Sequence, residues 1–205
     1  MKAILIPTAV ACIVAGCATS VSDDEAQRRA EEAIRSSFTH GNREIAARVE
    51  KQDDVQALCS RYRNRPPKDV AEKIEKSEAA AIRYPTPGKF LGDWRQGEKI
   101  AQSGYGMRFT DHDTKQPNGG NCYACHRLAP QELSYGTVGP SLYRYGALRG
   151  SSEAMQRYTY GKIYNAEAFS ACSSMPRFGP HGILTEAQIT HLVALLLDPE
   201  SPVNR

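Results

Sequence analysis

The sequence predicts an all-α protein with a helical N-terminal extension. Two observations lead to this class: charged stretches with apolar residues at helical spacing between residues 22 and 84, and short helical patterns at about 93–103, 151–164 and 185–197. Long loops separate these later patterns. Such loops are uncommon in a compact domain unless something else organises them, and a large prosthetic group would do so.

Composition supports a globular chain and excludes several function classes. The 205 residues are 40% hydrophobic and 24% charged, enough for one core plus an extension. The net charge is only +3 and no long run of lysine and arginine occurs, so nucleic acid is not an expected partner. No segment after the leader approaches the roughly 20 apolar residues that a membrane-spanning helix needs.

The first residues have the pattern of an export signal. Lys2 precedes an apolar run from Ala3 to Ala15, which is typical of a signal peptide over residues 1–16. The sequence VAGC ending at Cys17 resembles the bacterial lipobox, in which the cysteine is lipidated, whereas the alternative is cleavage after Ala18. We therefore expect a periplasmic protein, with an anchor to the membrane if Cys17 is lipidated.

The extension predicted at residues 17–88 contains two or three helices. Ser22 and Glu25 fit a capping box at the start of the first one. Proline-containing breaks occur at 66–67 and 84–88, and the second separates the extension from a domain at 89–205. One apolar face is approximated by Ile45, Val49, Val55, Leu58 and Tyr62.

The motif that carries chemistry is Cys122-Tyr-Ala-Cys125-His126, the C-x-x-C-H pattern of c-type haem attachment. On a short turn the two thiols can reach the two vinyl groups of one porphyrin while the adjacent imidazole binds the iron. A thioredoxin-like pair would need a strand-then-helix setting, and a zinc site would need a second ligand pair; neither is evident. The sequence predicts one covalently bound haem c.

An electron-carrying haem iron needs a sixth ligand. Met175 lies in a loop about 50 residues after His126, and the proline that follows it favours an extended backbone that can aim the thioether. His181 is the alternative ligand, and a third possibility is that Met175 only packs against its neighbours. Met155 lies in a predicted helix, where core packing is expected. Met107 precedes the attachment motif.

The histidine should also have a partner that orients it, because the imidazole nitrogen that does not bind the metal usually donates to a carbonyl. Pro140 lies in the rigid turn Val138-Gly139-Pro140-Ser141, and its carbonyl is the predicted acceptor. The alternative is an ordinary loop proline.

These motifs resemble class I cytochromes c: GDWRQGEKIA at 92–101, the haem motif, GPSL at 139–142, the Met175 loop and the helix at 185–197. More closely, residues 90–205 resemble SoxX, the monohaem subunit of the sulfur-oxidising SoxAX cytochrome. The specific features are YGTVGPSL at 135–142, MPRFG at 175–179 and LDPESPVN at 197–204.

The resemblance implies a class I cytochrome c fold and a SoxA-type cytochrome partner in a heterodimer. The complex would couple thiosulfate oxidatively to a cysteine of the carrier SoxYZ, and this chain would pass the electrons to a small acceptor cytochrome. The sequence offers no catalytic base or substrate pocket, so no residue is expected to be catalytic. The alternatives are a free-standing periplasmic electron carrier and a haem enzyme or gas sensor with an open iron site.

Two cysteines remain outside the leader and the haem motif, Cys59 and Cys172. In an oxidising compartment they suggest a disulfide that would pin the extension beside the Met175 loop. A buried unpaired thiol, a link to another subunit and a thiol site for metal or substrate sulfur are the alternatives. An apolar, weakly charged docking face for the partner is expected from Leu128, Ala129, Pro130, Phe178, Pro180 and Ile183. The alternative is that half of these residues merely line the haem pocket.

Overall fold

The computed structural model describes residues 21–39, 41, 47, 50–86, 88–108, 110–111 and 115–205, and these parts contain helices but no strand. The all-α prediction is therefore confirmed. The predicted signal peptide, Cys17, Ile45 and Val49 lie outside the described residues. The α-helices are α1 (Asp23–Ser37), α3 (Asp54–Arg61), α4 (Lys68–Ala80), α5 (Trp94–Gln102), α6 (Tyr145–Arg149), α7 (Glu153–Tyr164) and α8 (Glu186–Leu197).

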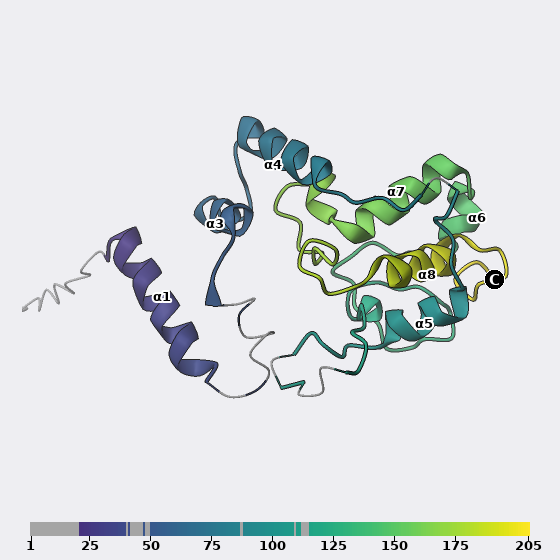
Figure 1. Cartoon of the computed structure of the whole chain (residues 1–205), viewed down its shortest axis with the longest axis horizontal. Coiled ribbons are helices and arrows are strands. Elements are labelled where there is room, and N and C mark those ends of the chain that lie inside the picture. Colours follow the sequence, from purple (N-terminus) through teal and green to yellow (C-terminus); the bar gives the residue numbers. More distant parts are fainter. Residues whose placement is uncertain are drawn as a thin grey trace, which may run out of the picture.

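Helix α8 forms the centre of the body, between α7 and α5 (Figure 1). It begins in a capping box in which the Thr185 side chain accepts from the Gln188 N–H and the Gln188 side chain accepts from the Thr185 N–H. Its sequence after the first turn is almost wholly apolar, so it is buried on nearly all sides. The buried core residues on this helix are Ile189, Leu192, Val193, Ala194, Leu195, Leu196 and Leu197.

Helices α5 and α8 cross closely because α5 carries a glycine at the contact. A Cβ on Gly97 would lie 2.2 Å from the His191 carbonyl oxygen and 2.9 Å from the Leu195 Cβ. Before α5, the Gly92 N–H donates to the Thr190 carbonyl oxygen at 3.0 Å. Any larger residue at position 97 would therefore push the two helices apart.

The segment after α8 returns to the core and completes α6. Val203 is fully buried, and its carbonyl oxygen accepts from the Arg144 N–H at 2.7 Å. The Asn204 side chain accepts from the Gly146 and Ala147 N–H groups at 2.8 and 3.0 Å, so it satisfies donors in the first turn of α6. Helix α6 was not predicted from the sequence, because its five residues are too few to show the spacing of apolar residues that marks a helix.

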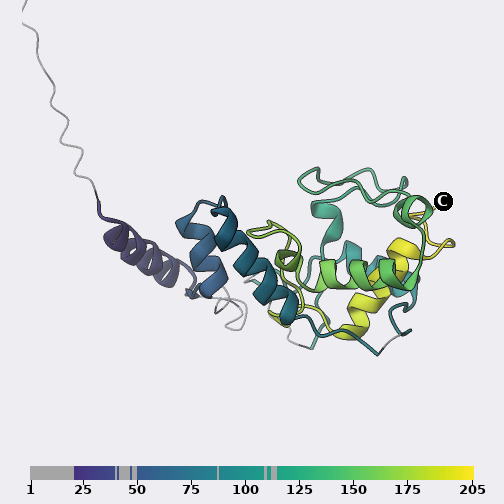
Figure 2. The same ribbon diagram turned by 90° about the horizontal axis from the view of Figure 1, so that it is seen from above.

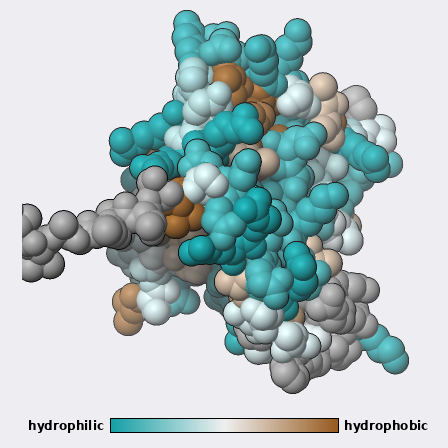
Figure 3. All heavy atoms as spheres, turned by 90° about the vertical axis from the view of Figure 1, so that its left-hand side faces the viewer, coloured by the Kyte–Doolittle hydropathy of each residue, from teal (hydrophilic) through white to brown (hydrophobic). Residues whose placement is uncertain are grey.

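The extension has two differently placed parts. Helix α1 lies at one end of the molecule, away from α5, α7 and α8 in both ribbon views, and has no buried residue (Figures 1 and 2). Helices α3 and α4 lie beside the body and bury Cys59 and Ile74. The face seen from this side is mainly hydrophilic, with small separate hydrophobic areas (Figure 3). Among the described residues, none belongs to a helix long and apolar enough to cross a membrane.

Candidate functional site

A cavity of about 720 Å³ lies in the body of the protein and brings together most of the predicted site residues. Its volume is within the usual range of pockets that hold cofactors. Apolar side chains make up much of the wall, including Leu142, Ile163, Phe178 and Leu196. The predicted site residues that line it are Cys122, Cys125, His126, Pro140 and Met175.

The two thiols and the imidazole are presented by one tight turn. The 3₁₀ turn η1 (Cys122–Ala124) follows Asn121, whose φ of 47° starts the turn in the left-handed region. The Cys125 and His126 N–H groups both donate to the Cys122 carbonyl oxygen, at 3.1 and 2.9 Å. This turn places three potential cofactor ligands within five residues on the cavity wall.

The thiols are not bonded to each other. Burial raises the pKa of Cys122 to about 12. A thioredoxin-like pair instead depends on a thiolate with a lowered pKa, so this environment argues against that interpretation. No group of three or more His, Cys, Asp and Glu side chains that could hold a metal ion occurs among the described residues.

His126 is oriented by the turn that follows it in the sequence. Its Nδ1 lies 2.7 Å from the Pro140 carbonyl oxygen, where the ring N–H donates, and this confirms the predicted partner. Gly139 packs flat against the imidazole, because a Cβ there would lie 2.2 Å from Cε1 and 2.5 Å from Nδ1. The second ring nitrogen, Nε2, is left available for a metal.

Met175 is half-buried and lines the same cavity, in the loop between η2 (Ala166–Ala168) and Phe178. Its N–H donates to the Ser173 side chain at 3.2 Å. Met107 also lines the cavity, although no sequence pattern favours a ligand that precedes the motif. Its position makes it a rival thioether that only the tertiary structure reveals.

The other predicted alternatives lie elsewhere. Met155 is in α7, packs against the core, and its Sδ accepts from the Tyr145 hydroxyl at 3.8 Å. His181 is not among the residues that line this cavity; its Nε2 lies 3.3 Å from Asp53 Oδ2. Of Met175, His181 and Met155, Met175 is the one that lines the cavity.

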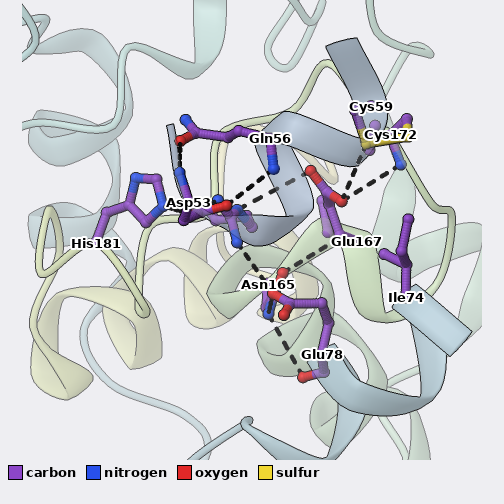
Figure 4. Close-up of polar contacts among 12 residues, drawn as sticks. Asp53, Gln56, Cys59, Ile74, Glu78, Asn165, Glu167, Cys172 and His181 are labelled. Atoms are coloured by element: carbon purple, nitrogen blue, oxygen red, sulfur yellow. Dashed lines mark hydrogen bonds and ion pairs between the residues drawn. A yellow bond between two sulfur atoms is a disulfide. The ribbon is translucent and has the colours of Figure 1, made fainter. Parts of the chain in front are cut away.

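Cys59 and Cys172 form a disulfide, as predicted, with Cα atoms 5.4 Å apart (Figure 4). It joins α3 to the loop that carries Met175. Cys172 has a φ of 58°, in the left-handed region, so the loop turns sharply at the bridge. The disulfide therefore fixes the extension beside this loop.

Beside the disulfide, the buried Arg177 guanidinium contacts three carboxylates. It forms ion pairs with Asp53, with Glu78 at 3.2 Å and with Glu167 at 4.0 Å. Glu78 also accepts from the Asn165 side chain at 2.8 Å, and Glu167 from the Cys172 N–H at 3.4 Å (Figure 4). Sequence reasoning missed this cluster because its members are scattered over more than 120 positions.

A second, smaller cavity of about 380 Å³ lies on the extension side of the loop. Its walls include the disulfide, Arg177, His181 and, again, Met175. The Met175 loop thus separates two spaces, one facing the thiols and imidazole and the other facing α3.

The predicted apolar docking face is wrong in most of its members. Leu128, Ala129, Phe178 and Ile183 are buried, because they pack into the core rather than face solvent. The exposed large apolar side chains near the cavity are different ones: Val138 and Leu148, at 77% and 73% exposure, both line it.

The donor set at the large cavity fits a haem c. Two unpaired thiols, an imidazole held at Nδ1 and a thioether line one apolar space, which is the set that c-type attachment with His and Met ligation requires. The residues that would hold the group are Cys122, Cys125, His126 and Met175.

No protein-family model matches the sequence. A relative of known sequence is the uncharacterized lipoprotein of Aquifex aeolicus (strain VF5), which is 41% identical over 156 residues, 75% of this chain and 73% of the relative. At this identity and coverage, the chain belongs to the same family as that lipoprotein.

Proposed function

We propose that this chain is an electron-transfer protein that carries one covalent haem c in a class I cytochrome c domain at residues 89–205. The observation that carries the proposal is that Cys122, Cys125, His126 and Met175 line one cavity of about 720 Å³. Haem c supplies reversible one-electron redox chemistry, and a site with two protein ligands to the iron favours electron transfer over substrate binding.

The residues that line the cavity would attach the haem, bind its iron and orient the iron ligand. The sulfurs of Cys122 and Cys125 would attach the group, His126 would bind the metal through Nε2, and Met175 would complete the coordination. The Pro140 carbonyl fixes the imidazole plane by accepting from Nδ1. Apolar side chains such as Phe178 and Leu142 line the cavity and exclude water, which supports a high reduction potential together with the thioether.

We further propose that the protein acts as a SoxX-type subunit. The support is the motif set YGTVGPSL, MPRFG and LDPESPVN, of which the first two also help to line the cavity. In this role the chain accepts electrons when a SoxA-type partner couples thiosulfate to the carrier SoxYZ, and it passes them to a small acceptor cytochrome. None of its own residues would be catalytic. A free-standing periplasmic carrier is the alternative.

Cys17 is the proposed lipidation site. The support is the lipobox-like sequence VAGC and the family relationship to a protein named as a lipoprotein. A lipidated Cys17 would tether the mature chain to a membrane facing the periplasm. Intact mass of the protein recovered with detergent tests this: a diacylglycerol-modified N-terminal cysteine is expected, and an unmodified N-terminus after Ala18 would reject it.

The test of the haem proposal is expression of the full chain in a host that matures c-type cytochromes. Haem should resist acid-acetone extraction and add its mass to the peptide that carries Cys122 and Cys125. Freely extracted pigment, or a colourless protein, would overturn the proposal.

Ligation is tested by Met175→Ala with Met107→Ala as the matched control, since both thioethers line the cavity. Met175→Ala should abolish the sulfur-to-iron charge-transfer band of the oxidised protein and lower the reduction potential. Met107→Ala should keep both. The reverse pattern would assign the ligand to Met107.

The SoxX-type role is tested by co-purification and by reduction kinetics. We expect a complex with a second c-type cytochrome, and thiosulfate-dependent reduction of this haem only when that partner and the carrier protein are present. Rapid reduction of the isolated chain by thiosulfate, or a chain that remains monomeric in native extracts, would favour the free-standing carrier instead.

A further inference from the structure

We propose that Arg177, together with Asp53 and Glu78 of the extension, forms a positioning clamp that keeps Met175 at the haem cavity. This inference rests on the proposed function and adds a role for the extension, which the cytochrome resemblance does not cover. The three residues act through the loop; none of them lines the large cavity.

Three N–H groups of the Met175 loop donate to side chains. The Ala171 N–H donates to Glu75 Oε1 of α4 at 3.0 Å, the Cys172 N–H to Glu167 Oε2 at 3.4 Å, and the Met175 N–H to Ser173 Oγ at 3.2 Å. These partners are all side chains, and one of them belongs to the extension. The Glu75 bond spans 96 positions, whereas Ser173 and Glu167 are close in sequence to the groups they bind. The loop is therefore fixed by nearby side chains and by the extension, rather than by a helix or sheet of its own.

Several contacts with the extension anchor the chain on both sides of Met175. Within residues 171–177, the extension contacts Ala171 through Glu75, Cys172 through the disulfide to Cys59, and Arg177 through Asp53 and Glu78. The anchors lie on both sides of Met175 in the sequence. A segment fixed at both ends has little freedom to carry its middle residue away from the cavity.

Arg177 carries a buried charge that depends on its carboxylate partners. Its side chain is only 7% exposed, and a buried guanidinium left without its carboxylates is strongly unfavourable. Glu167, the third carboxylate, belongs to the body and lies 4.0 Å from the guanidinium, farther than Glu78 at 3.2 Å. Loss of the extension carboxylates would therefore leave Arg177 poorly paired, and the loop would have to shift to solvate it.

A second space lies beside the loop, and the Met175 side chain can move into it. The cavity of about 380 Å³ on the extension side is lined by Met175, Arg177 and Ser174. A released loop can turn the Met175 side chain into this space, away from His126 and the two thiols. The clamp thus selects between two positions for the thioether, one in each cavity.

The test uses the full holoprotein with Asp53→Asn, Glu78→Gln and the double variant. Asparagine is as good an N-cap as aspartate, so Asp53→Asn removes the charge that faces Arg177 while it keeps the cap of α3. The matched control is Asp69→Asn with Glu72→Gln on α4, whose carboxylates make only exposed pairs with Lys73 and Lys68 at 3.7 Å.

Two readouts report on Met175 rather than on general stability. The first is the concentration of imidazole that displaces the sulfur-to-iron charge-transfer band of the oxidised haem. The second is amide hydrogen exchange of residues 171–177. In the double variant we expect displacement at an imidazole concentration lower by about tenfold or more, equivalent to about 1.4 kcal/mol, with faster exchange in this loop. The control should stay within about twofold of the wild type.

The outcomes separate the two proposals. A wild-type protein without covalent haem overturns the proposed function and the clamp with it. A wild type with the charge-transfer band, and a double variant within about twofold of it in imidazole displacement, overturns the clamp alone. If the double variant does not incorporate haem, the single variants are judged by the same two readouts and the same limits.

Discussion

The two walls of the large cavity are built in opposite ways. On the His126 wall, the ring is oriented by Pro140, only 14 positions away, and packed by Gly139 between them. On the Met175 wall, the loop is held by partners 96, 99, 113 and 124 positions away. One wall is held by neighbouring residues, whereas the other also depends on long-range contacts with the extension.

This difference determines how each wall responds to change. Local contacts re-form whenever the chain makes its turn, so the His126 wall should tolerate loss of the extension. Contacts between distant segments depend on the stability of the whole fold. We therefore expect conditions and substitutions that loosen α3 and α4 to act on the Met175 wall first.

The largest expected effect comes from removing the disulfide. In Cys59→Ala/Cys172→Ala the unfolded chain regains the freedom of a closed loop spanning 113 positions, which predicts a loss of about 4 to 5 kcal/mol in the free energy of unfolding. Urea unfolding of the variant against the oxidised wild type measures it, with reduced wild type as a second reference. If the loss were below about 1 kcal/mol, the Met175 wall would not depend on this long-range link.

An intermediate effect is expected at the His126 wall. In Gly139→Ala the new methyl group would lie 2.2 Å from Cε1 of His126, so the ring must shift and its hydrogen bond to Pro140 weakens. Overpacking of this kind costs about 1–3 kcal/mol of unfolding free energy. The control is Gly104→Ala, where the nearest atom is a side-chain atom of Asn121 at 3.3 Å. Equal stability of the two variants would show that the turn is looser than the contacts indicate.

The smallest expected effect is the pH dependence of stability that two carboxylates of the Met175 wall, Glu167 and Asp53, contribute. Burial raises the pKa of Glu167, and nearby Arg177 only partly offsets this. Burial also acts to raise the pKa of Asp53, but hydrogen bonds from the Gln56 N–H and Arg177 outweigh it, so that pKa lies below its ordinary value.

The signs of these two contributions are opposite. As the pH falls through the raised pKa of Glu167, the folded state gains a proton before the unfolded state does, and the free energy of unfolding rises. Below the ordinary Asp range of about 3.9, Asp53 becomes protonated in the unfolded chain first, and stability falls. Urea midpoints measured across this pH range should therefore rise and then fall as the pH is lowered. Glu167→Gln should remove the rise, and Asp53→Asn should weaken the fall. Unchanged profiles would contradict the assignment of these changes to Glu167 and Asp53.

The same contrast explains what the sequence could predict. The helices near 93–103, 151–164 and 185–197, the turn at Cys122–His126 and its carbonyl partner are short-range features, and spacing was enough to find them. The Cys59–Cys172 pairing was found by elimination among few cysteines.

The features that were missed depend on tertiary contacts. Met107 lines the cavity although it lies before the motif in the sequence. Arg177 forms ion pairs with carboxylates from three separate parts of the chain. Leu128 and Phe178, which were expected on an apolar docking face, are buried in the core. No local pattern marks any of these residues. Spacing within one segment carries no information about which distant segment will pack against it.

The return of the chain after α8 also sets an order of events. Tyr145, Leu148 and Arg149 of α6 form part of the cavity wall, and this helix is completed by Asn204, 57 positions after Ala147. When the chain is exported with its N-terminal side first, Cys59, Cys122 and Cys125 are exposed before residues 201–204 can pack against α6. Under the proposed function, the thiols of the motif would during this interval be open both to the haem-attachment machinery and to mispairing with Cys59. Haem delivery would then have to precede both the oxidation of these thiols and the packing of residues 201–204 against α6.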